Sequence, residues 1–283
     1  MFKTITKKIL CGVLALTASF GALATMTGCE TSYPEVEIQL EFNGKAYTLE
    51  YKLYRKLAPA TVNHFLALAD AHYYDGLVIH DYKAGKMYGG GYTWSDGELT
   101  YKEYYTEVAK IASFPTTVYR DEAKTLPTYT LYGEFGANNF SVQSGALKES
   151  YGSLAMFYTD KNTDAEVVVE RSSGAGAAFK EYKYNSATSL FSICLSDASA
   201  SSKEYCTFGT LQNKDTLKNL RKAIEDFVES KYGDAEEYMD DFVTSTVIQV
   251  DEDDAIVGNQ ERTALYTVPN EPIVIKKVSV TKY

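Results

Sequence analysis

Residues 57–66 of the chain read Leu-Ala-Pro-Ala-Thr-Val-Asn-His-Phe-Leu. Apolar residues recur from here at the i, i+3, i+4 and i+7 spacing of one helical face, at Val62, Phe65, Leu66 and Ala69. Pro59 lies near the first turn, where a missing backbone N–H costs nothing because that group has no partner inside the helix. The pattern predicts an amphipathic helix that begins at about residue 59.

The segment before this helix predicts a β-hairpin. Residues 35–41 alternate apolar and polar side chains with period two, which is typical of a half-buried strand. Asn43 and Gly44 follow, a pair that favours a tight hairpin turn. Residues 46–54 then alternate again, so we expect them to form the second strand of the hairpin.

Further strands and a second helix are predicted towards the C-terminus. Residues 187–195, 205–211 and 273–280 have the composition of strands. Between the last two, Asp215 is a candidate helix cap, and the apolar residues that follow it have helical spacing, at Leu217, Leu220, Ile224, Phe227 and Val228. The fold class is therefore mostly β with two helices, and closure of the sheet into a barrel would leave no sheet edge open.

Three long segments interrupt this pattern, at residues 92–131, 159–184 and 230–266. Each is polar or rich in tyrosine and lacks a long regular period, so we interpret them as loop insertions. A short acidic helix is expected within residues 234–244. The chain has 24 tyrosines, and we expect those of the first insertion to contact a partner.

The first residues predict export and lipid anchoring. Residues 1–8 carry three lysines and no acid, residues 9–26 are apolar to weakly polar, and Gly28 and Cys29 follow. This is similar to a bacterial lipoprotein signal, in which the chain is cut before a lipidated cysteine; an ordinary signal peptide is the alternative. We expect an extracytoplasmic protein anchored to a bacterial membrane, with a signal peptide at 1–28, a lipid on Cys29 and a short tether at 29–34.

Charge and cysteine content restrict the partners and the chemistry. The formal net charge is −10, and a strongly acidic chain repels nucleic-acid phosphates, so we expect no nucleic-acid partner. We expect a monomer. Outside the cytoplasm, Cys194 and Cys206 either form a disulfide or remain free as small buried residues. The sequence leaves both possibilities open.

Two groups of candidate metal ligands favour structural roles. His64, His72 and His80 are eight residues apart, but the first two straddle a helix end and the third lies on a strand, so we expect local packing or hydrogen bonding. Residues 251–254 read Asp-Glu-Asp-Asp and lack the spacing and the glycine of a calcium loop, so we expect a solvated acidic loop. We predict no metal site and no cofactor.

Six segments resemble the cyclophilin family, in the family's own order. They are residues 57–66, 73–80, 133–139 (beginning Gly-Glu-Phe), 152–156, 186–189 and 208–209. The resemblance implies one domain over residues 35–283, folded as a cyclophilin-like closed β-barrel with two capping α-helices and the three insertions as long loops. It also implies peptidyl-prolyl cis-trans isomerase activity without a cofactor.

The resemblance places one residue of unexpected charge in the substrate groove. Rotation about an X–Pro bond has a barrier of roughly 18–20 kcal/mol because amide resonance must be broken. An enzyme lowers this barrier by binding the twisted state more tightly than the planar states. In cyclophilins an arginine donates to the prolyl nitrogen while an apolar pocket holds the ring. Asp81 stands at the arginine position here, and an ionised carboxylate only accepts hydrogen bonds.

Other groove positions differ from the family in polarity and size. Lys86 replaces a pocket phenylalanine, while Met87 keeps the neighbouring methionine. Gly89 and Leu190 replace two glutamines, and Ser192 replaces the second pocket phenylalanine. These changes reverse a charge, open the apolar pocket and remove two amides that would hold a peptide.

The remaining groove candidates are aromatic. Phe157 and Tyr158 replace a small backbone-binding pair, and Tyr205 keeps a position that the family fills with histidine or tyrosine. We predict weak or lost isomerase activity toward exported polypeptides. The alternative is a non-catalytic module of the cell envelope that binds a proline-containing peptide or an envelope protein.

Overall fold

A computed structural model of the chain describes residues 31–135, 138, 147–158, 163–170, 177–182, 187–196, 205–233 and 238–283. For residues 157, 158, 177 and 238 it describes the backbone only. The predicted signal peptide and the predicted lipid on Cys29 lie outside the described residues.

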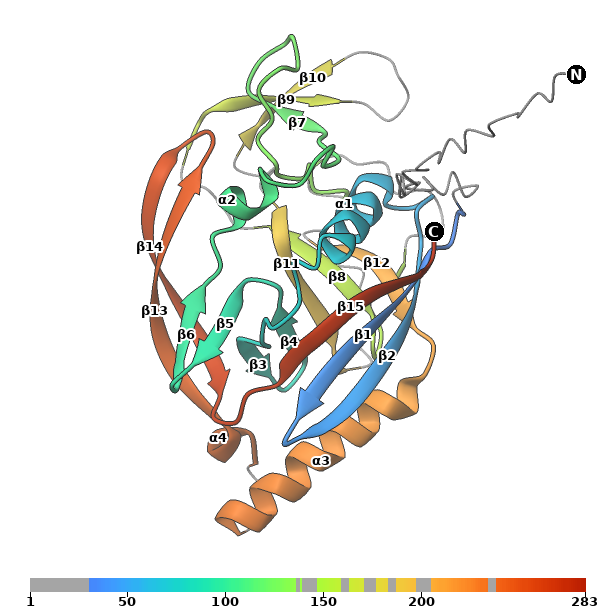
Figure 1. Cartoon of the computed structure of the whole chain (residues 1–283), viewed down its shortest axis with the longest axis vertical. Coiled ribbons are helices and arrows are strands. Elements are labelled where there is room, and N and C mark those ends of the chain that lie inside the picture. Colours follow the sequence, from blue (N-terminus) through green and yellow to red (C-terminus); the bar gives the residue numbers. More distant parts are fainter. Residues whose placement is uncertain are drawn as a thin grey trace, which may run out of the picture.

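An eight-stranded antiparallel sheet forms the body of the molecule (Figure 1). In sheet order its strands are β15 (Val274–Lys282), β1 (Glu35–Phe42), β2 (Lys45–Leu53), β12 (Cys206–Leu211), β8 (Leu154–Tyr158), β11 (Ala187–Cys194), β4 (Lys86–Gly89) and β3 (Asp81–Lys83). The sheet curls, and two backbone hydrogen bonds join its ends: Ile79 donates to the Ile273 carbonyl at 2.9 Å, and Ile275 donates to the Leu77 carbonyl at 2.7 Å. The mostly-β fold class predicted from the sequence is confirmed.

The β1–β2 hairpin forms where the alternation predicts it. Asn43 and Gly44 have φ angles of 46° and 71°, the left-handed values that a type I′ turn requires. Alternate side chains of β1, such as Ile38 and Leu40, are completely buried. The period-two pattern therefore determines which face of the strand enters the core.

Helix α1 (Pro59–Asp70) packs its predicted apolar face into the curled sheet. The ring of Phe65 lies 5.2 Å from that of Phe208 and 5.9 Å from that of Phe191, so one helical side chain touches two strands. Aromatic pairs at this separation add to the stabilisation from burial alone.

The N-terminus of α1 is capped by a residue distant in sequence. Ala58, at the cap position, has no side chain that can accept a hydrogen bond. The buried carboxylate of Glu134 accepts instead, from the backbone N–H of Ala60 at 3.1 Å and of Thr61 at 2.8 Å. A carboxylate at this end of a helix also interacts favourably with the helix dipole.

Helix α3 (Lys214–Tyr232) covers the opposite end of the barrel (Figure 1). Its apolar stripe is buried as predicted, at Leu217, Leu220, Ile224 and Val228. The Phe227 ring lies 5.5 Å from the Phe42 ring of the first hairpin. In the described part of the chain, no helix has the length and apolar character needed to cross a membrane.

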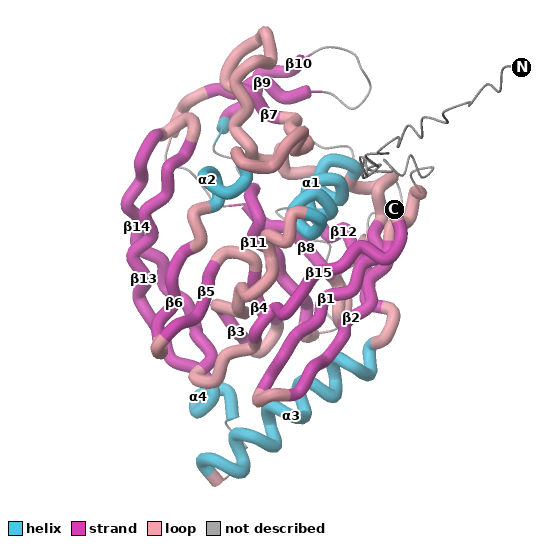
Figure 2. Tube along the Cα trace, in the orientation of Figure 1, coloured by secondary structure: helices cyan, strands magenta, loops and turns pink. Residues whose placement is uncertain are grey.

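The insertions contain regular structure that the sequence pattern did not indicate (Figure 2). The elements are β5 (Tyr92–Ser95), β6 (Glu98–Tyr101), α2 (Tyr104–Val108), β7 (Val118–Tyr119), β9 (Glu166–Glu170), β10 (Ala177–Glu181), α4 (Tyr238–Phe242), β13 (Val243–Asp254) and β14 (Gly258–Pro269). Helix α4 lies within the predicted acidic helix. The long β13–β14 hairpin was not predicted, because many of its side chains are exposed and its apolar alternation is weak.

Tyrosines join the insertions to one another. The hydroxyl of Tyr105 donates to Asp254 Oδ2 at 2.8 Å, and the hydroxyl of Tyr182 donates to the same oxygen at 2.6 Å. The hydroxyl of Tyr101 donates to Glu252 Oε1 at 3.2 Å. The expectation that tyrosines of the first insertion face a partner is therefore wrong for Tyr101 and Tyr105, whose hydroxyls bind other parts of the same chain.

The acidic stretch 251–254 is the end of strand β13, and the expected solvated loop is wrong for half of it. Glu252 and Asp254 are only 3% and 2% exposed, while the alternate residues Asp251 and Asp253 face solvent. The alternation arises because successive strand residues point to opposite faces. The two buried carboxylates are the ones that accept from tyrosines.

Candidate functional site

Asp81, Lys86 and Ser192 lie on the same side of the barrel wall. Residues directly opposite each other in an antiparallel sheet share a face. Asp81 is opposite Tyr88, and Tyr88 is opposite Ser192. Lys86 precedes Tyr88 by two residues along the strand and so also points to this side. We call this side of β3, β4 and β11 the groove face.

Met87 and Gly89 point to the other side, into the barrel core. Met87 is buried in the main apolar cluster opposite Ile193. A Cβ at Gly89 would lie 3.1 Å from Ile79 Cδ1 and 3.3 Å from the Phe191 ring. The structure therefore separates these two candidates from the groove face, and the core explains why position 89 is a glycine.

Asp81 joins the barrel to the inserted β13–β14 hairpin. Its side chain is almost completely buried, and the residue is 5% exposed. Asp81 Oδ1 accepts from the backbone N–H of Thr267 in β14 at 2.9 Å, and Oδ2 lies 2.6 Å from Lys83 Nζ. Both carboxylate oxygens are thus engaged. The position at which the resemblance implies an arginine holds an acceptor that fastens an inserted strand to the barrel edge.

Lys86 forms a second charged pair on the groove face. Its Nζ lies 2.7 Å from Glu149 Oε1 and 4.5 Å from the centre of the Tyr205 ring. Tyr88 lies between the two charged pairs. Burial, together with the neighbouring Tyr205 and Asp81, raises the pKa of Tyr88 to about 12, so its phenol stays protonated at neutral pH.

The two β11 candidates are both buried. Ser192 is fully buried, and its Oγ has no hydrogen-bond partner among the described residues. Leu190 packs against Gly91, where a Cβ would lie 2.6 Å from Leu190 Cδ2. Gly90 has a φ of 97°, and a Cβ there would lie 2.4 Å from the Ser189 carbonyl oxygen. The glycine run thus serves close backbone packing.

Phe157 and Tyr158 have their backbone in β8, and their side chains lie outside the described residues. Sequence reasoning missed three groups that complete the groove face: Lys83, Glu149 and Thr267. The first carries a usable signal, since Lys83 is two residues from Asp81 on a strand and must share its face. The other two come from distant segments and have no local signal.

The three histidines pack or hydrogen-bond against other side chains. His64 Nε2 lies 3.1 Å from the Tyr104 hydroxyl, and His72 pairs with a nearby aspartate. His80 is enclosed by aromatic rings at 4.6 and 4.8 Å. Burial lowers the pKa of His64 and of His80 to about 3. Among the described residues, no group of three or more His, Cys, Asp or Glu side chains is arranged to hold a metal.

Cys194 and Cys206, for which the sequence left two possibilities open, are free and buried in the structure. Cys206 Sγ accepts from the Thr61 hydroxyl at 3.5 Å, and burial raises the pKa of this thiol well above its ordinary value. Both cysteines therefore behave as small buried residues.

Among the described residues, the groove face has no cation outside an ion pair that could act as a charged donor toward a substrate. Its two described cations, Lys83 and Lys86, each lie within ion-pair distance of a carboxylate. An ion-paired ammonium is a weaker donor toward a third group, because part of its charge is already compensated. The phenol of Tyr88 is half-buried and carries no charge, and the Ser192 hydroxyl is fully buried.

The chain has relatives among known proteins. The family model described as cyclophilin type peptidyl-prolyl cis-trans isomerase/CLD matches residues 37–247. No curated protein matches the chain at a significant level. Among solved structures, a cyclophilin type peptidyl-prolyl cis-trans isomerase of Cryptosporidium parvum is similar, at 16% identity and a TM-score of 0.45, over 89% of this chain and 99% of that one. The Mimivirus cyclophilin is similar at 14% identity and a TM-score of 0.41, over 90% and 92%.

Proposed function

Because the chain belongs to the cyclophilin-type peptidyl-prolyl cis-trans isomerase family, we propose that it binds exported polypeptides on this scaffold with weak or lost isomerase activity. The observation that carries the proposal is the carboxylate of Asp81. The resemblance implies an arginine at this position, and the oxygens of Asp81 are engaged by Thr267 and Lys83. A carboxylate cannot donate to the prolyl nitrogen.

The size of the missing interaction supports a large loss of rate. A hydrogen bond from a charged donor contributes about 1.5–3 kcal/mol. Since about 1.36 kcal/mol corresponds to a factor of ten in rate, its loss lowers the rate by about one to two orders of magnitude. A negative charge at the same place, and a lysine where the resemblance implies a pocket phenylalanine, lower it further.

Exchange spectroscopy of a proline peptide tests the proposal. The cis–trans exchange rate of a blocked Ala-Pro peptide is measured by NMR with the full chain and, separately, with an ordinary cyclophilin. We expect the full chain to reach at most about one hundredth of the cyclophilin rate. A rate within about threefold of the cyclophilin would overturn the proposal.

Two variants at one position distinguish a weakened proline site from a repurposed one. Asp81→Arg restores the family's donor, and Asp81→Asn removes the charge without adding a donor of comparable strength. We expect neither to reach the cyclophilin rate, because Lys86 and Ser192 still stand where the resemblance implies phenylalanines. If Asp81→Arg alone restores activity, the groove face is still a proline site. If activity is absent in every form, the chain acts as a peptide- or protein-binding module of the cell envelope.

We also propose that the chain is a lipoprotein outside the cytoplasm. The proposal is supported by the lysines of residues 1–8, the apolar run that follows and the Gly28-Cys29 pair. Labelling of bacteria with a radioactive fatty acid tests it. We expect label on the wild-type chain and none on Cys29→Ser; equal labelling of both would contradict the lipid attachment.

A further inference from the structure

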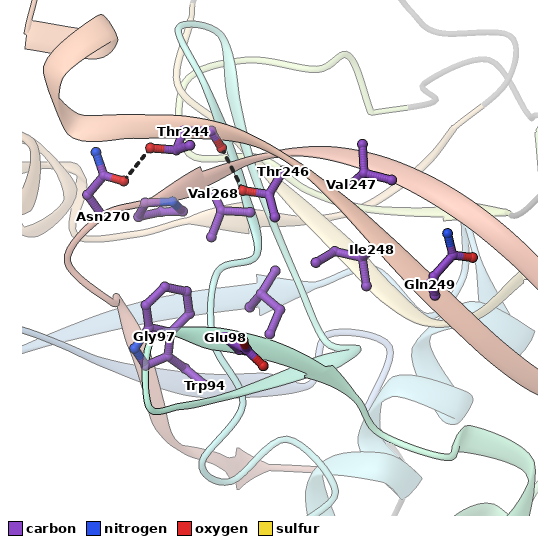
Figure 3. A pocket seen from close by; sticks show the side chains of 12 residues that line it. Trp94, Gly97, Glu98, Thr244, Thr246, Val247, Ile248, Gln249, Val268 and Asn270 are labelled. Carbon is purple, nitrogen blue, oxygen red and sulfur yellow. Dashed lines mark hydrogen bonds between the residues drawn. The ribbon is translucent and has the colours of Figure 1, made fainter.

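A cavity of about 490 Å³ lies between the two inserted hairpins, β5–β6 and β13–β14 (Figure 3). It adjoins a small apolar cluster in which Val250 and Ala264 are buried. At the end of this cluster, the side chains of Trp94, Leu99 and Ile248 are only partly buried and line the cavity. The two hairpins thus meet closely in one place and leave a space of mixed polarity in another.

The cavity runs beside the edge of strand β13. Consecutive strand residues point to opposite faces, yet all four residues of 246–249 line the cavity. Figure 3 shows Val247 and Ile248 pointing to opposite sides of the strand. A cavity can touch both faces of a strand only where it lies along the strand's edge. On the opposite wall, the turn residue Gly97 and the first two residues of β6, Glu98 and Leu99, line the cavity.

This edge has backbone groups available for a further strand. The β13–β14 pair and the β5–β6 pair are each two-stranded sheets among the described residues. An exposed sheet edge presents unpaired N–H and C=O groups that can pair with an added strand. Added strands take their affinity from these main-chain hydrogen bonds and their specificity from side-chain pockets.

The lining disfavours an acidic ligand and offers both apolar and polar contacts. No lysine, arginine or histidine is among the described residues that line the cavity. One carboxylate, that of Glu98, lines the cavity. The other polar groups are neutral: the Thr244 hydroxyl donates to Asn270 Oδ1 at 2.6 Å, and the Thr246 hydroxyl donates to the Thr244 carbonyl at 3.2 Å. Trp94 supplies a large apolar surface. An acidic ligand would find no counter-charge here.

We propose that this cavity binds an extended segment of a partner polypeptide that lacks acidic side chains, which adds as a strand along the edge of β13 and places an apolar side chain against Trp94. The inference rests on the proposed function, because it adds a second site for the same class of partner. It places that site on the insertions, away from the charged pairs of Asp81 and Lys86.

Trp94 is the only tryptophan of the chain, so its fluorescence reports on this cavity alone. The probe is the blocked pentapeptide Thr-Val-Leu-Val-Thr, titrated into the full chain. We expect a saturable shift of tryptophan emission to shorter wavelength. The same peptide with alternate amides N-methylated keeps its side chains but lacks strand donors, and we expect it to bind about tenfold more weakly or worse. No shift up to about 1 mM peptide, or equal binding of the methylated peptide, would overturn the proposal.

Two neighbouring substitutions provide a matched control. Thr246→Arg puts a long cation into the cavity, whereas Ser245→Arg puts the same side chain on the exposed opposite face of the strand. We expect affinity to fall at least about tenfold in the first and less than about twofold in the second. Circular dichroism and thermal unfolding show whether each variant is folded. Equal affinity of folded Thr246→Arg and wild type would contradict the proposed site.

Failure here is distinguishable from failure of the proposed function. Calorimetric titration with the same peptide detects binding anywhere on the chain. Heat of binding without a change in Trp94 emission overturns the cavity site and leaves polypeptide binding intact. Full isomerase activity with a normal Trp94 response overturns the proposed loss of catalysis and leaves the cavity site intact.

Discussion

The barrel and the inserted hairpins are stabilised by different interactions. The barrel core is apolar, with rings such as Phe65 and Phe208 in contact across helix and sheet. The insertions are joined in large part by phenol–carboxylate hydrogen bonds, as between Tyr105 and Asp254. Apolar burial is non-directional and roughly proportional to area, whereas each buried carboxylate depends on particular donors. The barrel core should therefore tolerate apolar substitutions of similar size, whereas the contacts between insertions depend on particular tyrosines.

The largest expected effect is the loss of a core ring. Phe65→Ala removes the contacts of α1 with two strands and leaves a cavity, so we expect a loss of about 3–5 kcal/mol in the free energy of unfolding. Leu265→Ala is the control in the inserted hairpin, where the side chain is 67% exposed, and it should change stability by less than about 0.5 kcal/mol. Urea denaturation measures both. Similar losses in the two variants would break the distinction between the regions.

The barrel could be predicted from sequence because its signals are local. The spacing of Val62 and Phe65 indicates a helix from a few neighbouring residues, and the adjacent pair Asn43 and Gly44 indicates a turn. The joints of the insertions have no such signal. Tyr105 and Asp254 are 149 residues apart, and each alone resembles a surface residue. Only the fold shows that they meet.

A fall in pH should weaken the fold through two buried histidines, His64 on helix α1 and His80 between the barrel and the inserted hairpins. The folded pKa values of His64 and His80 are about 3, below the unfolded value of about 6.5. Their stabilisation is present above about pH 6.5 and is lost as the pH falls toward 3. Between about pH 7 and 5.5 we expect a loss of roughly 1.3 kcal/mol per histidine.

Urea denaturation across this pH range measures the loss. Glu134 has a raised pKa because of burial, so it contributes in the opposite direction as the pH falls. Replacing one of the two histidines with glutamine should remove about half of the pH dependence. A stability that stays constant between about pH 7 and 5.5 would contradict the assignment of neutral buried rings.

A smaller effect is expected at the joint between insertions. Tyr105→Phe removes one donor to Asp254 while Tyr182 still donates to the same oxygen, so we expect a loss of about 1 kcal/mol. The double variant with Tyr182→Phe leaves that oxygen without either phenol, and its loss should exceed the sum of the single losses. Urea denaturation of wild type, the two single variants and the double variant gives the coupling energy of a double-mutant cycle. Strict additivity would show that the two phenols act independently.

The contacts of the groove face involve residues far apart in sequence, so the sequence pattern alone could not predict them. The resemblance to the family implies an arginine where Asp81 stands, and polarity alone predicts that a donor is missing. What the carboxylate does instead depends on Thr267, which is 186 residues away in a hairpin that the sequence pattern did not reveal. Met87 kept the family's residue, yet its side chain lies in the core.

The central claim is that Asp81 acts as a joint between the barrel and the inserted hairpin. Amide hydrogen exchange of Thr267, measured by NMR in wild type and in Asp81→Ala, tests it most directly. We predict that the Thr267 amide exchanges at least about tenfold faster in the variant while the amides of the β1–β15 ladder keep their wild-type rates. Unchanged exchange at Thr267, or equal acceleration in both places, would contradict the account.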